Sequence, residues 1–253
     1  MNKIVLITGA TAGFGEACAY KFAENGYNLI LNGRRNERLE ILKEKLQKLF
    51  NINIHLLPFD VRNKEQVFTS LEQVPQEWRS IDVLVNNAGL ALGRDLIQEG
   101  DIEDWDTMID TNVKGLLYVT RGVVPWMIEN KKGHIINLGS IAGKEVYERG
   151  NVYCASKFAV DALTKSMRID LLEHQIKVTS INPGAAETEF SLVRFKGNEE
   201  ASKKIYEGYS PLTAKDVAEV VYYVTTLPQH VCVNELSITS TQQASAVYFN
   251  KKS

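Results

Sequence analysis

A tyrosine and a lysine four residues apart, Tyr153 and Lys157, have side chains that can move a proton. In a helix this spacing puts both side chains on one face, one turn apart. A free phenol has a pKa of about 10, and each unit of lowering needs about 1.4 kcal/mol of preferential stabilisation of the phenolate. The positive charge of Lys157 can supply part of that stabilisation. The pair is therefore a candidate for acid–base chemistry, although this spacing alone is not specific.

A second pair with the same spacing, Tyr248 and Lys252, lies in the polar C-terminal tail. No serine stands thirteen residues before Tyr248, whereas Ser140 stands at that distance before Tyr153. Only the first pair is expected on a helix that follows the end of a strand, where ligands bind in open α/β sheets. The reactive pair is therefore predicted to be Tyr153 and Lys157.

A glycine-rich turn near the N-terminus has the composition of a phosphate-binding loop. Gly9, Gly13 and Gly15 stand between a short apolar run and an amphipathic stretch, with Thr11 and Phe14 among them. Glycine permits a tight turn and a close backbone approach to a pyrophosphate, and the free N–H groups of a helix start attract the anion. The spacing is GxxxGxG, so a merely tight strand-to-helix turn is the alternative.

The end of the second predicted strand indicates which dinucleotide would bind. Sites that prefer NAD place an acidic residue there to accept hydrogen bonds from the adenosine ribose. This sequence has Gly33 followed by Arg34 and Arg35. Because guanidinium groups suit phosphate oxygens and no carboxylate would repel a 2′-phosphate, NADP is favoured over NAD. The alternative is a solvated pair of charges at the start of a helix.

The elements that must position these residues alternate along the chain. Short Val- and Ile-rich runs alternate with longer amphipathic stretches, which predicts an α/β fold with a doubly wound, Rossmann-like parallel sheet flanked by helices. One such helix is expected over residues 37–50, with Leu39, Leu42, Leu46 and Leu49 on its apolar face. Seven strands are predicted, at residues 3–8, 28–32, 54–59, 83–86, 134–138, 177–182 and 235–238.

Length and composition limit the classes of protein. The chain has 253 residues, 44% of them hydrophobic, which suits one domain over residues 1–253. A formal charge of -2 argues against a nucleic-acid partner. No uninterrupted apolar run reaches the roughly 20 residues of a membrane span, and no signal peptide is recognised, so a soluble cytoplasmic protein is expected. The three cysteines predict neither a disulfide framework nor a metal site.

Further motifs occur in a characteristic order. Asp60-Val61 follows the third predicted strand, Asn86-Asn87-Ala88-Gly89 the fourth and Pro183-Gly184 the sixth, while Asn112 lies on a predicted helix. Together with the glycine turn, Ser140, Tyr153 and Lys157, these motifs resemble the short-chain dehydrogenase/reductase family over essentially the whole chain. The resemblance implies hydride transfer between NADP and a substrate carbon.

The resemblance also assigns roles to single residues. It implies that Tyr153 is the acid/base, that Lys157 also holds the nicotinamide ribose, that Ser140 hydrogen-bonds the substrate oxygen and that Asn112 supports a water-linked proton path. Taken alone, Asn112 could be a solvated helix residue and Ser140 a cap. The residues expected at the cofactor are Gly9, Thr11, Gly13, Phe14, Gly15, Arg34, Arg35, Asp60, Val61, Asn87, Ala88, Gly89, Tyr153, Lys157, Pro183, Gly184 and Thr188.

A narrower resemblance concerns the substrate. Residues 150–153, 188–197 and 227–231 resemble the NADP-dependent 3-hydroxy acid dehydrogenase subgroup, which implies serine, allo-threonine or 3-hydroxyisobutyrate-like acids and their semialdehydes as substrates. The irregular, polar stretch 184–209 is a candidate substrate lid. Arg194 on it could bind the substrate carboxylate, although Arg149, Lys196 or an exposed Arg194 with no ligand are alternatives.

Two other functions stay open. One is reduction of another carbonyl, such as a 3-oxoacyl thioester, a sugar, a steroid or a diketone, and the charged stretch 144–149 between Ser140 and Tyr153 departs from the subgroup's expected pocket wall. The other is a catalytically silent NADP-binding sensor, against which the complete set of Asn112, Ser140, Tyr153 and Lys157 argues. The family resemblance implies a homotetramer.

Overall fold

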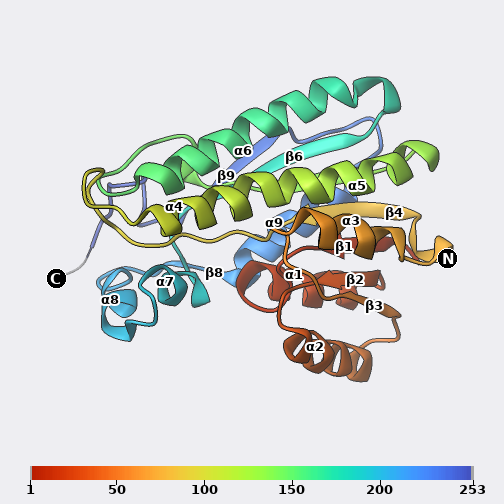
Figure 1. The fold of residues 1–253 in the computed structure, drawn as a ribbon, viewed down its shortest axis with the longest axis horizontal. Coiled ribbons are helices and arrows are strands. Elements are labelled where there is room, and N and C mark those ends of the chain that lie inside the picture. The colour runs from red at the N-terminus through yellow and green to blue at the C-terminus, as the bar shows by residue number, and fades with distance from the viewer. Residues whose placement is uncertain (1, 252–253) are drawn as a thin grey trace.

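The computed structural model describes residues 2–251, and its centre is a seven-stranded parallel sheet (Figure 1). The strand order is β3-β2-β1-β4-β5-β6-β9, as in a doubly wound sheet, so the predicted α/β fold class is confirmed. The strands are β1 (Ile4–Ile7), β2 (Asn28–Asn32), β3 (Ile54–Leu57), β4 (Ile81–Asn86), β5 (His134–Leu138), β6 (Lys177–Pro183) and β9 (Glu235–Ile238).

Helices cover both faces of this sheet. One face is packed by α1 (Gly13–Glu24), α2 (Asn36–Leu49) and α9 (Ala214–Thr226), with Phe22, Leu39 and Val221 completely buried. The other is packed by α3 (Lys64–Glu72), α5 (Leu116–Glu129) and α6 (Asn151–Asp170). Because both faces are covered, β1 is apolar throughout and fully or nearly fully buried.

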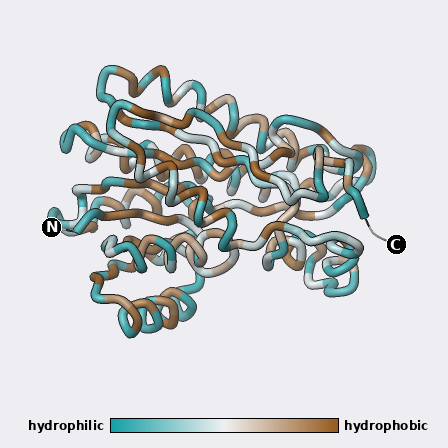
Figure 2. Tube along the Cα trace, turned by 180° about the vertical axis from the view of Figure 1, so that it is seen from behind, coloured by the Kyte–Doolittle hydropathy of each residue, from teal (hydrophilic) through white to brown (hydrophobic). Residues whose placement is uncertain are grey.

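The amphipathic pattern of α2 is visible in Figure 2, where hydrophobic and hydrophilic residues alternate along its turns. The structure places Leu39, Leu42 and Leu46 in the core, as predicted. Leu49 is 64% exposed, so its assignment to the apolar face was wrong. It is the last residue of the helix, and Phe50, which packs against the core, follows it in extended conformation.

Two regions have secondary structure that the sequence does not predict. The stretch 184–209 contains β7 (Ala186–Glu187), α7 (Glu189–Arg194) and α8 (Glu199–Lys204). Its strand pairs with β8 (Leu212–Thr213) in a small second sheet. Between α4 (Ile102–Ile109) and α5, a π-helical turn over Asp110–Gly115 carries Asn112. Local patterns did not predict these features because tertiary contacts stabilise them.

No helix among the described residues is long and apolar enough to cross a bilayer.

Candidate active site

A cavity of about 950 Å³ opens at the carboxyl ends of the central strands, on both sides of the point where strand order reverses between β1 and β4. Ligands of doubly wound sheets bind at this position. The cavity is lined by every residue expected at the cofactor except Gly15, and also by Ser140 and Arg194. The fold thus brings residues from position 9 to position 194 to one surface.

The glycine turn forms the wall of this cavity before α1. Gly9 and Gly13 have φ angles of 64° and 55°, which side-chain-bearing residues rarely adopt. Gly15 does not line the cavity, because it is buried against the turn, and a Cβ there would collide with the carbonyl oxygen of Gly9. The helix begins after Ala12, which provides no side-chain cap, so its first N–H groups are available to an anion.

The Asn86–Gly89 motif ties this turn to β4. The Asn87 side-chain amide donates to the carbonyl oxygens of Thr8 (2.8 Å) and Gly9 (3.1 Å). The Thr8 hydroxyl accepts hydrogen bonds from the backbone N–H groups of Asn87 and Ala88, each at 3.0 Å. The neighbouring Asn86 is buried and donates to Thr120 and Asn137 at 2.9 Å. These bonds fix the cavity floor in the absence of any ligand.

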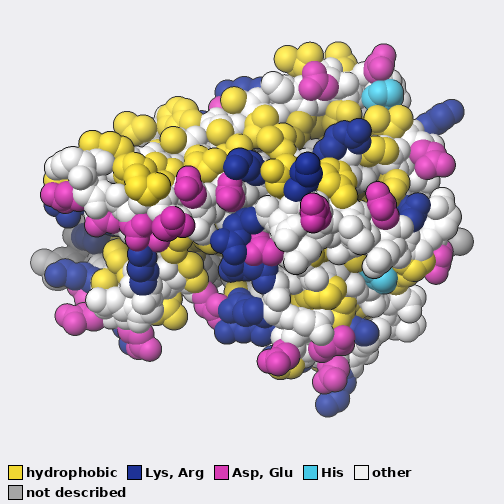
Figure 3. Space-filling view, in the orientation of Figure 1, with side chains coloured by type: hydrophobic (Ala, Val, Ile, Leu, Met, Phe, Trp, Pro, Cys, Tyr) yellow, Lys and Arg dark blue, Asp and Glu magenta, His cyan; other side chains and the backbone are white. Residues whose placement is uncertain are grey.

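Arg34 and Arg35 lie at the opposite rim from Tyr153, where β2 leads into α2. The Arg35 guanidinium donates to the hydroxyl of Thr11 at 3.1 Å, and Arg34 lies 3.8 Å from the carboxylate of Asp60. Gly33 packs closely against Thr11, because a Cβ at position 33 would lie only 2.8 Å from the Thr11 methyl carbon. Figure 3 shows basic side chains grouped between the α7–α8 lobe and the part of the molecule that contains α2. This rim suits a phosphate group.

Tyr153 and Lys157 lie together on α6 and are almost completely buried, with 9% and 7% exposure. The Lys157 ammonium group donates to the carbonyl oxygen of Leu138 at 2.8 Å and lies 5.9 Å from the centre of the Tyr153 ring. Burial lowers the pKa of Lys157 to about 8. Burial and the neighbouring Tyr147 raise the pKa of Tyr153, while Ser140 and the Arg194 charge act in the opposite direction.

The raised pKa of Tyr153 differs from the simple expectation that Lys157 lowers the pKa of this phenol. In the protein alone, the desolvation of a buried phenolate outweighs the effect of nearby positive charge. The Lys157 ammonium group contacts the Leu138 carbonyl oxygen and lies over the Tyr153 ring, and its charge does not offset the cost of burial. A phenolate at Tyr153 therefore needs the further positive charge of a bound ligand.

Ser140 and Asn112 occupy different positions. The Ser140 side chain lines the cavity and also accepts a hydrogen bond from the Ala142 N–H at 3.1 Å, as a cap of the short 3₁₀ turn. Asn112 is 2% exposed and does not line the cavity. Its side chain bonds the backbone N–H and carbonyl of Leu90, each at 2.8 Å, and the hydroxyl of Ser156 at 3.0 Å. Asn112 thus joins the loop after β4 to the helix that carries Tyr153.

Arg194 projects from α7 into the cavity and is 8% exposed, which excludes a fully solvated lid arginine. Its Nε donates to the Gly93 carbonyl oxygen at 3.2 Å and its Nη1 to the Tyr147 hydroxyl at 2.9 Å. The guanidinium carbon lies 5.6 Å from the centre of the Tyr153 ring. The proposed alternative Lys196 pairs instead with Asp104 at 2.9 Å on the surface.

Several cavity residues are absent from the sequence-based set. Tyr147 lies between Ser140 and Tyr153 in a charged stretch, and Phe190 meets the Tyr153 ring edge-on at 5.6 Å. An aromatic residue in an otherwise polar stretch was the only available signal for either. The C-terminal Ala246, Val247 and Phe249 also line the cavity. Tyr248 is 72% exposed, and Lys252 lies outside the described residues.

A nicotinamide dinucleotide fits these features. The uncapped start of α1 and the left-handed Gly9 and Gly13 suit a pyrophosphate, and the basic rim suits a 2′-phosphate. Lys157 and Tyr153 lie at the other end of the same cavity. The long, partly apolar cavity thus has an anion site at the middle, another at one end and acid–base groups at the other.

Known proteins show the same architecture. Residues 3–198 match the short chain dehydrogenase family. The NADP-dependent 3-hydroxy acid dehydrogenase YdfG of Salmonella typhi is 49% identical over 244 residues, covering 96% of this chain and 97% of that protein. Sulfoacetaldehyde reductase 2 of Chromohalobacter salexigens is 47% identical over 249 residues, covering 98% of each chain.

A solved structure, the closed form of serine dehydrogenase complexed with NADP+, superposes with a TM-score of 0.91 at 47% identity and covers 99% of this chain and 100% of its own. Serine dehydrogenase from Escherichia coli superposes with a TM-score of 0.81 at 44% identity, covering 95% and 99%. The family match includes the glycine turn, Ser140, Tyr153, Lys157 and Arg194. The chain belongs to the short-chain dehydrogenase family.

Proposed function

We propose that this protein is an NADP-dependent oxidoreductase that interconverts small 3-hydroxy acids and their 3-oxo acids or semialdehydes. The observation that carries the proposal is the buried Arg194 guanidinium beside Tyr153 in the cavity. A buried positive charge next to an acid–base group favours a small substrate that carries an anionic group. The relatives named as 3-hydroxy acid and serine dehydrogenases support the same substrate class.

Each residue of the proposed active site has its own role in the reaction. When bound, NADPH would supply the hydride and NADP+ would accept it. Tyr153 donates a proton to, or takes one from, the substrate oxygen, and Ser140 holds that oxygen by a hydrogen bond. Lys157 stabilises the phenolate and holds the nicotinamide ribose. The Asn112 side chain fixes the loop at Leu90 against α6, so Asn112 acts as a positioning residue. We propose that it also supports a water-linked proton path.

Substrate orientation depends on Arg194. Two of its five N–H groups are used by Gly93 and Tyr147, which leaves donors for a carboxylate. The guanidinium carbon lies 5.5 Å from the centre of the Tyr147 ring and 5.6 Å from that of the Tyr153 ring, so aromatic rings shield it from water and strengthen its charged hydrogen bonds. The same donors can bind a sulfonate, and the sulfoacetaldehyde reductase relative makes a short sulfonate aldehyde the second candidate substrate.

A panel of carbonyl compounds tests the proposal. The protein is mixed with NADPH or NADH, and loss of the reduced-nicotinamide absorbance is followed with malonic semialdehyde, sulfoacetaldehyde, a 3-oxoacyl thioester, a sugar and an uncharged diketone. We expect the acid-bearing aldehydes to give the highest kcat/KM, with NADPH preferred. Highest activity on uncharged compounds would favour another carbonyl substrate, and cofactor binding with no turnover would favour a sensor.

We also infer that the chain forms a homotetramer in the cytoplasm. Apolar side chains gather on the outer face of α4, α5 and α6 (Figure 3), among them Ile102, Leu117, Phe158 and Ile169, which are 38–75% exposed. Apolar surface of this kind is typical of an interface between copies. Light scattering on the purified protein tests the assembly, and a monomer would contradict it.

A further inference from the structure

The short helix α7 reaches both ends of the cavity. Its first residue, Glu189, contacts the arginines at the start of α2, more than 150 positions away in the sequence. Its second residue, Phe190, meets the Tyr153 ring, and its last, Arg194, lies beside the same ring. The only acidic side chain of this helix therefore lies at the end of the cavity that suits a 2′-phosphate.

The geometry of Glu189 is that of a shared counter-ion. Both of its carboxylate oxygens accept hydrogen bonds from Arg38 Nη1 at 3.2 Å, and its Oε2 lies 3.9 Å from Arg35 Nη2. Arg35 in turn donates to Thr11 of the glycine turn at 3.1 Å. Each of the three charged side chains is about half exposed, from 45% to 50%. They are therefore open to exchange of partners.

The neighbouring arginine already has its own carboxylate. Arg34 lies near Asp60, whose carboxylate is also held by Arg62 at 2.7 Å. Burial and the adjacent positive charges of Arg38 and Arg34 disfavour the charged form of Arg35, while Glu189 favours it, so the pKa of Arg35 is lowered overall. Glu189 is thus the anion that balances Arg35 and Arg38 when no ligand phosphate is present.

We propose that Glu189 competes with the 2′-phosphate of the cofactor for Arg35, and so limits how strongly the protein prefers NADP over NAD. This inference rests on the proposed use of NADP. A phosphate monoester carries nearly two negative charges near pH 7 and so outcompetes a single carboxylate. The neutral ribose hydroxyl of NAD does not compete. When the phosphate takes Arg35, the Arg38 ion pair is the one that still joins Glu189 to α2.

The test measures cofactor binding without turnover. Dissociation constants for NADPH and NADH are determined by fluorescence titration at low salt, for the wild type and for Glu189→Gln. Removing a carboxylate from a half-exposed position beside a dianion should tighten NADPH binding by about three- to tenfold. NADH binding should stay unchanged.

Two further variants sharpen the result. Glu199→Gln removes the same charge from α8, the next helix along the chain, where the carboxylate pairs with Lys203 at 3.4 Å. It should leave the dissociation constants of NADPH and NADH unchanged. In Arg35→Gln, adding Glu189→Gln should give a smaller gain in NADPH affinity, because the contested guanidinium is gone.

The competition by Glu189 and the proposed use of NADP are contradicted by different results. Unchanged or weaker NADPH binding by Glu189→Gln, or equal tightening of NADPH and NADH, would overturn the competition. Failure of the proposed NADP use is a different result: the wild type would then bind NADPH no more tightly than NADH. Raising the salt concentration should shrink the effect of Glu189→Gln, since exposed charges are screened.

Discussion

The two ends of the cavity are built from charged groups in opposite ways. At the rim near α2, Arg34, Arg35 and Arg38 have side chains that are 45–58% exposed and share carboxylate partners at 3.2–3.9 Å. At the end near α6, Lys157 and Arg194 are 7% and 8% exposed and donate to backbone carbonyls. Water weakens each interaction at the rim, whereas burial strengthens each one at the inner end.

The difference indicates what each end can contribute. A screened, half-exposed cluster can select between cofactors by about a factor of ten without a large cost to folding. A buried charge destabilises the protein unless it is paired, and it acts strongly on any ligand that enters. We therefore expect cofactor choice to be adjustable at the rim, and chemistry and substrate orientation to depend on single groups at the inner end.

Loss of the acid–base group should have the largest effect. Tyr153→Phe removes one oxygen atom and leaves the other residues expected at the cofactor in place, so turnover should fall by about a thousandfold while NADPH binding is retained. Steady-state kinetics and fluorescence titration measure the two quantities. Tyr248→Phe, at an exposed position, should change neither. Substantial turnover in Tyr153→Phe would contradict the assigned role.

Arg194→Met should produce the next largest effect. Loss of a buried guanidinium should lower kcat/KM for 3-hydroxy acids by about a hundredfold, with little change for an uncharged alcohol of similar size. Arg149→Met, at an exposed position of the same region, is the control and should leave both unchanged. Equal losses on charged and uncharged substrates would mean that Arg194 only supports Tyr147 and the Gly93 loop.

Lys157→Met should show the cost of burying a charge. The folded protein holds this lysine with its pKa lowered from 10.5 to about 8, so the protonated lysine destabilises the native state below pH 8. At pH 7 the variant should be more stable to unfolding by about 1–3 kcal/mol.

The advantage should shrink as the pH rises from about 8 to 10.5, because the folded wild type releases its proton before the unfolded chain does. Urea unfolding across this range measures the trend. Lys165→Met, on the exposed face of the same helix, should show no such trend. A variant less stable than the wild type at every pH would show that the hydrogen bond to Leu138 outweighs desolvation.

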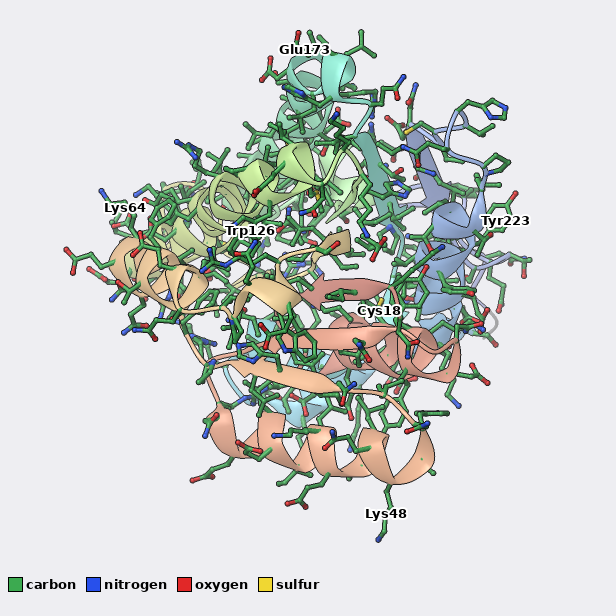
Figure 4. The ribbon with its side chains drawn as sticks, turned by 90° about the vertical axis from the view of Figure 1, so that its right-hand side faces the viewer. Cys18, Lys48, Lys64, Trp126, Glu173 and Tyr223 are labelled. Atoms are coloured by element: carbon green, nitrogen blue, oxygen red, sulfur yellow. The ribbon has the colours of Figure 1, made fainter. Side chains whose placement is uncertain are left out.

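Arg34→Ala should have the smallest effect of the four, because the side chain is 58% exposed. NADPH binding should weaken by about tenfold and NADH binding should not change. Lys48→Ala removes a positive charge from the far end of α2, where Figure 4 shows the side chain projecting outward, and should be neutral. Equal weakening of both cofactors would contradict a phosphate contact.

The sequence by itself determined the sheet and the local motifs. β2, β5 and β9 have the predicted bounds, and the other central strands differ by one or two residues at one or both ends. Val- and Ile-rich runs and glycine turns are local signals, so the strands could be predicted from the sequence. The role of Ser140 was predicted from the family resemblance. The glycine turn, the arginines after β2 and the Tyr153–Lys157 pair could be predicted for the same reason as the strands. Each depends on residue types at short spacing.

Only the tertiary structure decided which distant side chains meet. The contact of Glu189 with Arg35 and Arg38, and that of Arg194 with Tyr147 and Gly93, join segments far apart in the chain. Whether a phenol's pKa rises or falls also depends on burial and on surrounding charge, which no local pattern contains. Packing places these groups in three dimensions, and their energies depend on distance and on the exclusion of water.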